Sequence, residues 1–441
     1  MIRYVGLDVH KRVVQACILD ALGNVQAEER LELSAEKLRT FVQTSLTPED
    51  HVILEATTNT WAIVDVLRTR AAKVFVSNPI QTKAIAQAKV KTDKVDARVL
   101  AQLLRLNFVP LVWEPDAVTR DLRRWTRHRA GLVRQTTLLK NRIHSVLHQR
   151  LIQAPMDTLF GKGGRRFLGE LVLDEEGRWL IDSDLRLLEA VEEEIARVDQ
   201  ILAKKGHIDP RVKLLMTMPG VSLTVAQCLV AALGDISRFR DGNHAASYLG
   251  LVPSIKQSAE HCYHGPITKA GRGHARWMMI QAAQHVRLHA GPLGVFFRRL
   301  TKKKNYNVAV VAAARKLVTI AWHMLTHNEP YRYARPQPTQ AKLARLRIKA
   351  TGRKRQGGTA KGSHRSQAYG TGVTQRVVKS LHQVLTEEGL PPLAAVPAGE
   401  ARTIREAGCS DYVAGLSQNH LVPRQPRQGD AIQAAEEVKP S

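Results

Sequence analysis

Val5-Gly6-Leu7-Asp8-Val9-His10-Lys11 begins with a short apolar run that ends at the acidic residue Asp8. A short apolar segment of this kind predicts a β-strand, and its acid is expected where the strand emerges at the edge of the sheet. Val52-Ile53-Leu54-Glu55-Ala56 repeats the pattern. We therefore expect two strands that each place a carboxylate where a metal and a substrate can reach it.

Two further acids follow on a different kind of element. Thr92 to Leu104 has the apolar spacing of a helix, and the i, i+3 spacing puts Asp93 and Asp96 on one face. Asp8, Glu55, Asp93 and Asp96 are thus expected to converge. Clustered carboxylates repel one another unless a cation neutralises them, and Mg²⁺ or Mn²⁺ prefers oxygen ligands. The pattern predicts metal-assisted phosphodiester chemistry, with ordinary surface or capping acids as the alternative for each residue.

The segments around these acids predict a mixed α/β layer domain. Strands joined by hairpins come first, and helices then alternate with strands. The expected strands are 3–7, 13–19, 25–33, 52–55 and 73–76, and the expected helices are 34–45, 61–70 and 92–104.

The composition indicates a polyanionic partner. The 441 residues carry 66 Lys and Arg against 40 Asp and Glu, which gives a formal net charge of +26 and a pI of about 10.2. Nucleic acid is the first inference, because binding it releases counterions from the phosphate backbone. We expect no membrane partner, since no signal peptide and no uncharged apolar span are recognisable. Val308 to Ala314 is expected to be a buried helix.

The middle of the chain is predicted to be helical. Residues 116–152 and 184–204 are long amphipathic segments, which favour either an antiparallel pair within one chain or a coiled coil between protomers. Residues 211–330 predict a second compact domain, in which Pro219-Gly220-Val221 resembles the turn of a helix-hairpin-helix element. Phosphate binding and plain helix packing both remain open for this turn. From about residue 333 onward, Pro, Gly and basic residues predict a flexible tail.

Basic residues near the end of the first strand and in the second domain are candidates for nucleic-acid contact, with solvated faces as the alternative. They are Lys11, Lys269, Arg272, Arg276, Arg298, Arg299, Lys302, Lys303 and Lys304.

The whole pattern resembles the DEDD transposases of the insertion-sequence 110 family, which are also described as bridge-RNA-guided recombinases. The resemblance covers about residues 1–330. In the first half it rests on the segments around the four acids. In the second half it rests on Pro219-Gly220-Val221, Gly234-Asp235-Ile236, Tyr248-Leu249-Gly250-Leu251-Val252-Pro253 and Lys269-Ala270-Gly271.

The resemblance implies a fold and a division of the chain. Residues 1–112 would form an α/β RuvC-like (ribonuclease-H-type) domain with a mixed sheet and the acidic tetrad Asp8, Glu55, Asp93 and Asp96. A helical coiled-coil linker would span 113–210, and a mainly α-helical transposase domain would span 211–332. Residues 333–441 lie outside the resemblance as a basic extension.

The resemblance also implies a reaction and partners. A serine nucleophile, which aligns best with Ser258, would act with Mg²⁺ or Mn²⁺ held by the four acids to recombine double-stranded donor and target DNA. A noncoding guide RNA would specify the sites, a dimer or tetramer would assemble, and the protein would work at the nucleoid in a prokaryotic cytoplasm.

Alternatives to this assignment remain at the level of the sequence. The family commonly has Gly after the nucleophilic Ser, whereas this chain has Ala259, so Ser254 is a second serine candidate. Tyr248 and Tyr263 would be the candidates for a tyrosine mechanism. A RuvC-like endonuclease that uses water is the alternative function, and a silent nucleic-acid-binding protein is a third.

Overall fold

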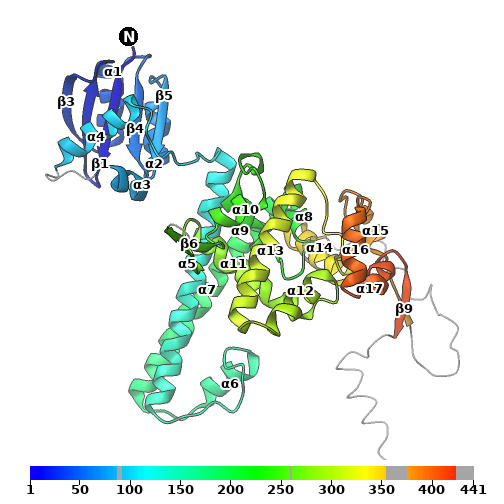
Figure 1. Ribbon diagram of the computed structural model, residues 1–441. Helices are drawn as coiled ribbons and strands as arrows, with labels where there is room; N and C mark the ends of the chain where they lie inside the picture. Colours follow the sequence, from blue (N-terminus) through cyan, green and yellow to red (C-terminus); the bar gives the residue numbers. More distant parts are fainter. Residues whose placement is uncertain (87–91, 259–260, 354–374, 424–441) are drawn as a thin grey trace, which may run out of the picture. The chain divides into compact units, whose positions relative to one another are not determined.

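The computed structural model describes residues 1–86, 92–258, 261–353 and 375–423 (Figure 1). Its contacts divide the chain into two compact units, Met1–Pro115 and Asp116–Ser441, and each is described by itself. Ala259, the residue that departs from the family pattern, lies outside the described residues.

The first unit is built on a five-stranded sheet with the order β3-β2-β1-β4-β5. Strand β1 is antiparallel to β2 and parallel to β4, so the sheet is mixed. This arrangement confirms the expected mixed α/β domain. The strands are β1 (Tyr4–Val9), β2 (Val13–Leu19), β3 (Val25–Glu32), β4 (His51–Glu55) and β5 (Lys73–Ser77).

Alternation along β1 separates the two faces of this sheet. Val5 and Leu7 are fully buried in the main core of the unit, to which α1 and α2 also contribute. Gly6 points to the opposite face, where α4 packs so closely that a Cβ atom on Gly6 would lie 2.0 Å from the carbonyl oxygen of Ala97. The helices are α1 (Ala35–Thr44), α2 (Thr60–Leu67), α3 (Pro79–Ile85) and α4 (Asp93–Arg105).

The second unit begins with a long helical hairpin. Helices α5 (Ala117–Gln149) and α7 (Glu175–Ile208) run side by side, and the segment with α6 (Lys162–Glu170) joins their far ends (Figure 1). Ile143 and Ile181, both fully buried, belong to the apolar cluster between them. The antiparallel pair within one chain is therefore present. Helix α7 starts earlier than the expected residue 184, because Asp174 caps its first turn by accepting from the Gly177 N–H.

A compact helical core follows the hairpin. Its Pro219-Gly220 turn joins α8 to α9 and is covered by the protein itself, because Gly220 has a φ of 71° and an added Cβ would lie 2.1 Å from the Ala282 carbonyl oxygen. The elements of this part are α8 (Pro210–Leu215), α9 (Leu223–Leu233), η1 (Ile236–Arg238), α10 (Gly242–Tyr248), β6 (Pro253–Ser258), β7 (His261–Ile267), α11 (Gly273–Gln284), η2 (His285–Leu288), α12 (Pro292–Thr301) and α13 (Tyr306–His327).

The expectation of a flexible tail from residue 333 onward is wrong for the described residues. Leu343 and Leu381 are buried in the same core as α9 and α13, so these residues gain the burial that a disordered tail lacks. Tyr333 also donates a hydrogen bond of 2.6 Å to Glu400. The elements are α14 (Pro336–Thr351), β8 (Gln375–Val378), α15 (Leu381–Glu387), α16 (Ala398–Glu406), α17 (Ser410–Leu416) and β9 (His420–Pro423). Arg353 is described, whereas Lys354 and Arg355 of the same basic run are not.

Helix α13 is long and apolar enough to cross a membrane by length and composition alone. Much of it is packed inside the helical core, where Ala309, Ala313 and Leu317 are fully buried. This burial confirms the expectation of a buried helix for most of Val308 to Ala314, whereas the Val308 side chain itself is 54% exposed.

Candidate active site

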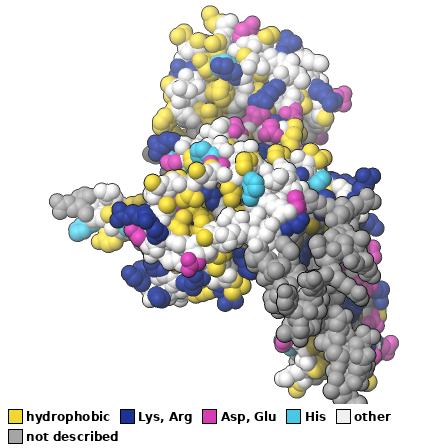
Figure 2. Space-filling model, turned by 90° about the vertical axis from the view of Figure 1, so that its right-hand side faces the viewer, with side chains coloured by type: hydrophobic (Ala, Val, Ile, Leu, Met, Phe, Trp, Pro, Cys, Tyr) yellow, Lys and Arg dark blue, Asp and Glu magenta, His cyan; other side chains and the backbone are white. Residues whose placement is uncertain are grey.

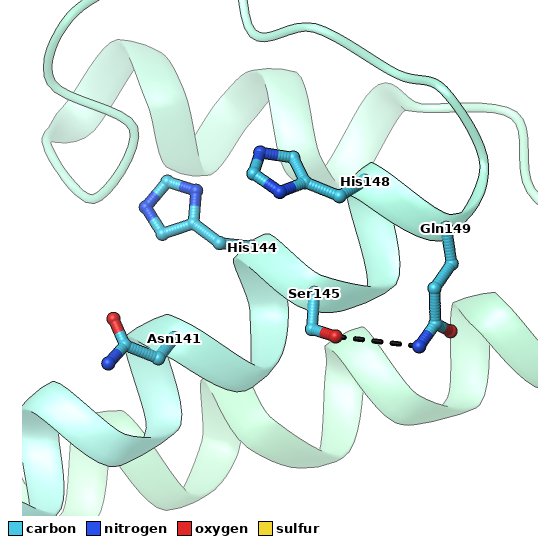
Figure 3. A pocket seen from close by; sticks show the side chains of 5 residues that line it. All are labelled: Asn141, His144, Ser145, His148 and Gln149. Atoms are coloured by element: carbon cyan, nitrogen blue, oxygen red, sulfur yellow. Dashed lines mark hydrogen bonds between the residues drawn. The ribbon is translucent and has the colours of Figure 1, made fainter.

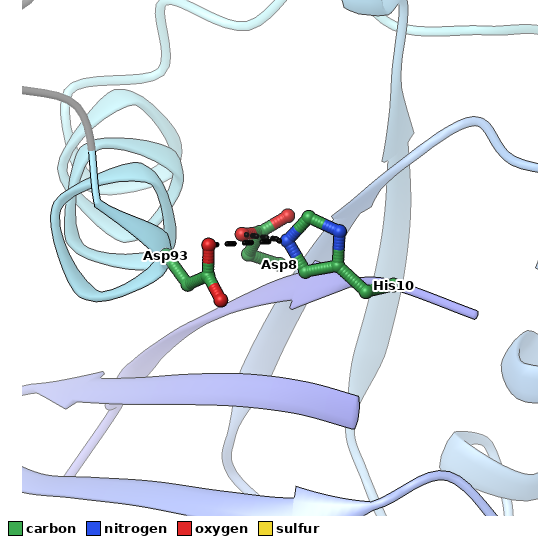
Figure 4. A group of neighbouring side chains, drawn as sticks. All are labelled: Asp8, His10 and Asp93. Carbon is green, nitrogen blue, oxygen red and sulfur yellow. Dashed lines mark hydrogen bonds and ion pairs between the residues drawn. The ribbon is translucent and has the colours of Figure 1, made fainter. Parts of the chain in front are cut away.

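Two of the four predicted acids meet at the end of β1 (Figure 4). Asp8 is the penultimate residue of β1, and Asp93 is the first residue of α4, whose N-terminus is capped by the Thr92 side chain. His10 lies between them, with its Nε2 atom 3.0 Å from Asp8 and 3.3 Å from Asp93. Ligand atoms from these three residues lie within 4.8 Å of one another. They form a group that could hold a metal ion.

Glu55 and Asp96 lie on the same side of the sheet. Strand β4 runs parallel to β1, and their pairing ends with Leu54 beside Leu7, so the next residues, Glu55 and Asp8, both face away from the main core. This is the side on which α4 packs. Asp96 lies in the first turn of α4, is half-buried, and acts on the Asp8 carboxylate electrostatically.

The electrostatics of Asp8 are those of a crowded carboxylate. Partial burial raises its pKa, the His10 imidazole opposes this shift, and the nearby charges of Asp93 and Asp96 raise the pKa further. A bound cation would relieve the same repulsion, and carboxylate oxygens are the ligands that Mg²⁺ and Mn²⁺ prefer. The donor set therefore fits such an ion.

Cations surround the acids on the solvent side. A hollow of about 410 Å³ is lined by His10, Lys11, Arg12, Arg30 and Asp93, among others. Lys11 and Arg12 belong to the exposed turn between β1 and β2. An anionic substrate would thus meet positive charge beside the carboxylates.

Sequence reasoning did not assign His10 to the acidic cluster. The signal that could have found it is the alternation along a strand, because residues 8 and 10 project to the same face.

Ser258 stands in a run of polar residues that is typical of a loop, but in the structure it belongs to a β-strand. It is the last residue of β6, which pairs with β7 in an antiparallel two-stranded sheet, so the local β-pairing outweighs the loop signal of its polar residues. Ser258 is exposed and lies directly opposite His261. Residues opposite each other in such a pair share a face, with Cβ atoms roughly 4.5–5.5 Å apart.

The register divides the hairpin into two faces. Lys256 and Tyr263, which pair with each other, share the face of Ser258 and His261. The opposite face carries the pair Ile255 and His264.

The other candidate nucleophiles have different surroundings. The Ser254 hydroxyl donates a 3.0 Å hydrogen bond to the Pro266 carbonyl oxygen within the hairpin. Tyr263 is exposed, whereas Tyr248 is half-buried and its hydroxyl accepts a hydrogen bond from Arg272.

Comparison with known proteins gives two family matches that together cover about half of the chain. Residues 5–151 match a model described as a transposase, the DEDD transposase of IS110 elements. Residues 212–294 match the model of the transposase IS116/IS110/IS902 family. The chain belongs to the IS110 family of transposases. The first match spans the four acids and the second spans the serine hairpin.

Individual relatives agree with this family. The transposase for insertion sequence element IS1111A of Coxiella burnetii is 25% identical over 356 residues, which cover 75% of this chain and 92% of the relative. The pilin gene-inverting protein of Moraxella bovis is 26% identical over 346 residues, which cover 74% of this chain and 97% of the relative. Transposases cleave and rejoin DNA, and this IS110-family chain is an enzyme of that general class.

The predicted basic residues fall into two groups. Some hold the fold: Arg276 donates to the carbonyl oxygens of Leu249 and Ala270, and Arg298 donates to that of His289. Others, Lys269 and Lys302 to Lys304, are exposed. Figure 2 shows Lys and Arg side chains spread over the face in view.

A separate hollow of about 490 Å³ lies on α5 and is lined by Asn141, His144, Ser145, His148 and Gln149 (Figure 3). Gln149 donates to the Ser145 hydroxyl at 3.5 Å. The lining contains no carboxylate, so it lacks the oxygen ligands that distinguish the Asp8 site.

Proposed function

We propose that this chain recombines the DNA of an insertion element by metal-assisted phosphoryl transfer. Asp8, Glu55, Asp93 and Asp96 would hold Mg²⁺, with Mn²⁺ as a substitute, and Ser258 would be the nucleophile. The observation that carries the proposal is the meeting of Asp8 and Asp93 from separate elements on the side of the sheet that also bears Glu55 and Asp96.

The first unit supports a RuvC-like assignment. Its sheet combines an antiparallel meander, β1 to β3, with two parallel strands, β4 and β5, and α4 covers the face that bears the acids. This is the mixed sheet and acid placement that the family resemblance implies.

The acid site would serve the reaction in two ways, through the ion that the carboxylates hold and through the basic residues beside them. A bound divalent ion supplies a Lewis acid that stabilises negative charge on the phosphate oxygens. Lys11 and Arg12 would attract the phosphodiester to the hollow beside Asp93.

On the second unit, the Ser258 hydroxyl would attack the phosphorus atom of the scissile phosphodiester. The Oγ–P bond forms as the bond from phosphorus to the leaving oxygen breaks. The hydroxyl proton of Ser258 passes to the imidazole of His261, and the leaving oxygen takes up a proton from water to become a hydroxyl. Rejoining reverses these steps: a hydroxyl from another strand gives its proton to water as it attacks the phosphoserine, the Oγ–P bond breaks, and the imidazolium returns its proton to Ser258. The phosphodiester energy is conserved, so no ATP is needed.

We also propose the family's partners for this chain. Double-stranded donor and target DNA, a noncoding guide RNA and further copies of the chain would form the complete complex, at the nucleoid of a prokaryotic cell. The net charge of +26 suits such partners.

One relative favours recombination over simple cutting. The Moraxella bovis protein is named for gene inversion, which requires that cut strands be rejoined. An endonuclease that uses water would hydrolyse the phosphodiester and leave ends that it could not rejoin.

The test is incubation of the purified chain with its element RNA, labelled donor and target DNA and Mg²⁺. We expect recombinant junctions and a denaturant-resistant protein–DNA adduct, both lost in Ser258→Ala and in Asp8→Asn. Ser254→Ala is the matched control, since its hydroxyl is engaged with Pro266. Cleavage that persists in Ser258→Ala without any adduct would identify the endonuclease instead.

A further inference from the structure

Three guanidinium groups, those of Arg272, Arg238 and Arg123, gather around Tyr248 in the second unit, and a fourth, that of Arg127, lies near Arg272. Arg272, at the N-cap of α11, donates from Nε to the Tyr248 hydroxyl at 3.2 Å. The Arg238 guanidinium lies 4.2 Å from the centre of the Tyr248 ring. Arg123 and Arg127, one turn apart on α5, both lie within electrostatic reach of Arg272. Such a concentration of like charge is unfavourable unless something offsets it.

The fold accounts for two of the four cations. Arg123 donates from Nε to the Ala231 carbonyl oxygen at 2.7 Å and from Nη2 to that of Ala232 at 3.2 Å. Arg238 donates from Nε to the Leu233 carbonyl oxygen at 3.0 Å. These carbonyls form the C-terminal end of α9, where the helix dipole favours positive charge.

Among the residues that the structure describes, Arg127 and Arg272, the other two cations, have no such hydrogen bonds to the carbonyl oxygens of a helix end. Across residues 1–86, 92–258, 261–353 and 375–423, Arg127 makes no hydrogen bond or ion pair, and its side chain lies at the surface. Arg272 donates to a neutral phenol rather than to a carboxylate. Partial burial and the neighbouring Arg272 charge lower the pKa of Arg127, as expected for a cation that lacks a counter-ion.

The Tyr248 hydroxyl is polarised by the arginines around it. Burial raises its pKa, but Arg272, Arg238 and Arg123 outweigh that effect and lower it overall. A hydroxyl polarised in this way is a stronger donor to an anion.

The cluster lies at the base of the serine hairpin. Gly271 has a φ of 66°, and an added Cβ would lie 2.0 Å from the Tyr248 carbonyl oxygen, so the chain returns from the hairpin directly onto Tyr248. The backbone hydrogen bonds between the two arms of the hairpin end next to Tyr248, where the Lys269 N–H donates to the Gly250 carbonyl oxygen at 3.3 Å. Six residues of strand β6 span roughly 20 Å, the length of about six base pairs of duplex.

We propose that Arg127, Arg272 and the Tyr248 hydroxyl bind one backbone phosphate of duplex DNA, a few base pairs from the phosphodiester that Ser258 attacks. Guanidinium groups bind phosphate oxygens in a bidentate manner, and backbone contacts fix the register of a protein on DNA without reading its sequence. The placement next to the cleavage point rests on the proposed function, whereas the phosphate site itself does not.

The test measures binding of a labelled 30-base-pair duplex to the full chain in EDTA, where no cleavage occurs, over a range of salt concentrations. Arg127→Gln and Arg272→Gln are each expected to weaken binding about tenfold. Because both residues would hold the same phosphate, the double variant should be little weaker than either single one, and the salt slope should fall by about one. Arg124→Gln removes an exposed charge from the same helix and should leave the affinity nearly unchanged.

Thermal unfolding separates a binding role from a structural one. Without DNA, Arg127→Gln should unfold at the same or a higher temperature, because it relieves repulsion. Arg123→Gln should unfold at a lower temperature, because it leaves the end of α9 uncapped.

Three results would overturn the proposal. Unchanged duplex affinity in Arg127→Gln would exclude the site. Additive losses of affinity in the double variant would exclude a shared phosphate. Weakened binding of a 30-nucleotide RNA, with unchanged duplex binding, would assign the site to RNA. Ser258→Ala should bind the duplex like wild type. If that variant also recombines normally while the arginine variants lose affinity, the serine mechanism fails and the phosphate site stands.

Discussion

At the scale of single residues, Gly6 sets the distance between the strand that carries Asp8 and the helix that carries Asp93. A Cβ atom at this position would lie 2.0 Å from the Ala97 carbonyl oxygen and 2.7 Å from the Ala101 backbone nitrogen. Both are backbone atoms of α4, which cannot move aside as a flexible side chain can. The close approach therefore belongs to the geometry of the acid cluster.

Gly6→Ala is expected to push α4 away from β1. The overpacking should destabilise the first unit by about 1–3 kcal/mol and separate Asp93 from Asp8, so DNA cleavage should fall even at temperatures where the variant is folded. Chemical denaturation and a cleavage assay check both effects. Gly131→Ala on α5 is the control, since an added Cβ there meets nothing closer than 4.0 Å and should stabilise its helix by about 0.5–1 kcal/mol. A fully active Gly6→Ala chain would show that α4 need not lie so close.

The position of His261 opposite Ser258 gives a second prediction at this scale. If the imidazole accepts the serine proton, His261→Gln should slow adduct formation about a hundredfold or more while leaving DNA affinity intact. His264→Gln is the matched control, because His264 lies on the other face of the same strand. Single-turnover measurement of the adduct distinguishes the two. Equal rates for both variants would exclude His261 as the base.

At the scale of elements, the sequence predicts the helices and strands whose apolar residues follow a regular spacing. The strands that carry Asp8 and Glu55, the helix that begins at Asp93 and the long helix α5 all lie where apolar spacing places them. The sequence did not predict α14, whose buried face rests on few apolar residues, such as Leu343 and Leu346. Ion pairs with distant partners hold the rest of that helix, and a sequence does not show which partners will meet.

Lys342 on α14 is one such long-range contact. Its ammonium donates to the carbonyl oxygens of Met218 at 2.7 Å and Val221 at 3.1 Å, on either side of the Pro219-Gly220 turn. Burial lowers its pKa to about 8. The lysine thus covers the turn that resembled a phosphate-binding element, which favours the packing role of that turn.

The lowered pKa of Lys342 predicts a pH dependence. Between about pH 8 and the ordinary lysine pKa near 10.4, the unfolded chain holds a proton that the folded chain has released, so this group's contribution to stability rises with pH. The difference in unfolding free energy between wild type and Lys342→Met should grow by about 1.4 kcal/mol per pH unit in this window. The difference between the two proteins is needed because a second group also titrates in this range. Burial raises the pKa of the Cys228 thiol to about 12, so the unfolded thiol loses its proton first and the stability of both proteins falls as the pH rises. A difference that stays constant with pH would contradict the assigned protonation.

At the scale of the whole molecule, the candidate catalytic groups are divided between the two units. Asp8, Glu55, Asp93 and Asp96 lie within Met1–Pro115, and Ser258 lies within Asp116–Ser441. The four acids follow local patterns in the sequence, whereas the assignment of Ser258 depends on the resemblance to the family. Contacts that depend on the fold, such as those of His10 with Asp93 and of Arg272 with Tyr248, could not be predicted from local pattern alone.

This division predicts that Mg²⁺ protects one unit and not the other. A cation bound at Asp8 and Asp93 stabilises only the unit whose folding creates the site, by about 2.7 kcal/mol at one hundred times the dissociation constant. Hydrogen exchange of the full chain should therefore slow in residues 1–115 when Mg²⁺ is added and stay unchanged in 116–441. Asp8→Asn should abolish the response and, without metal, slow exchange near β1, because it removes a carboxylate whose pKa is raised by burial and by Asp93 and Asp96. Protection that spreads over both units, or that survives in Asp8→Asn, would place the cation elsewhere.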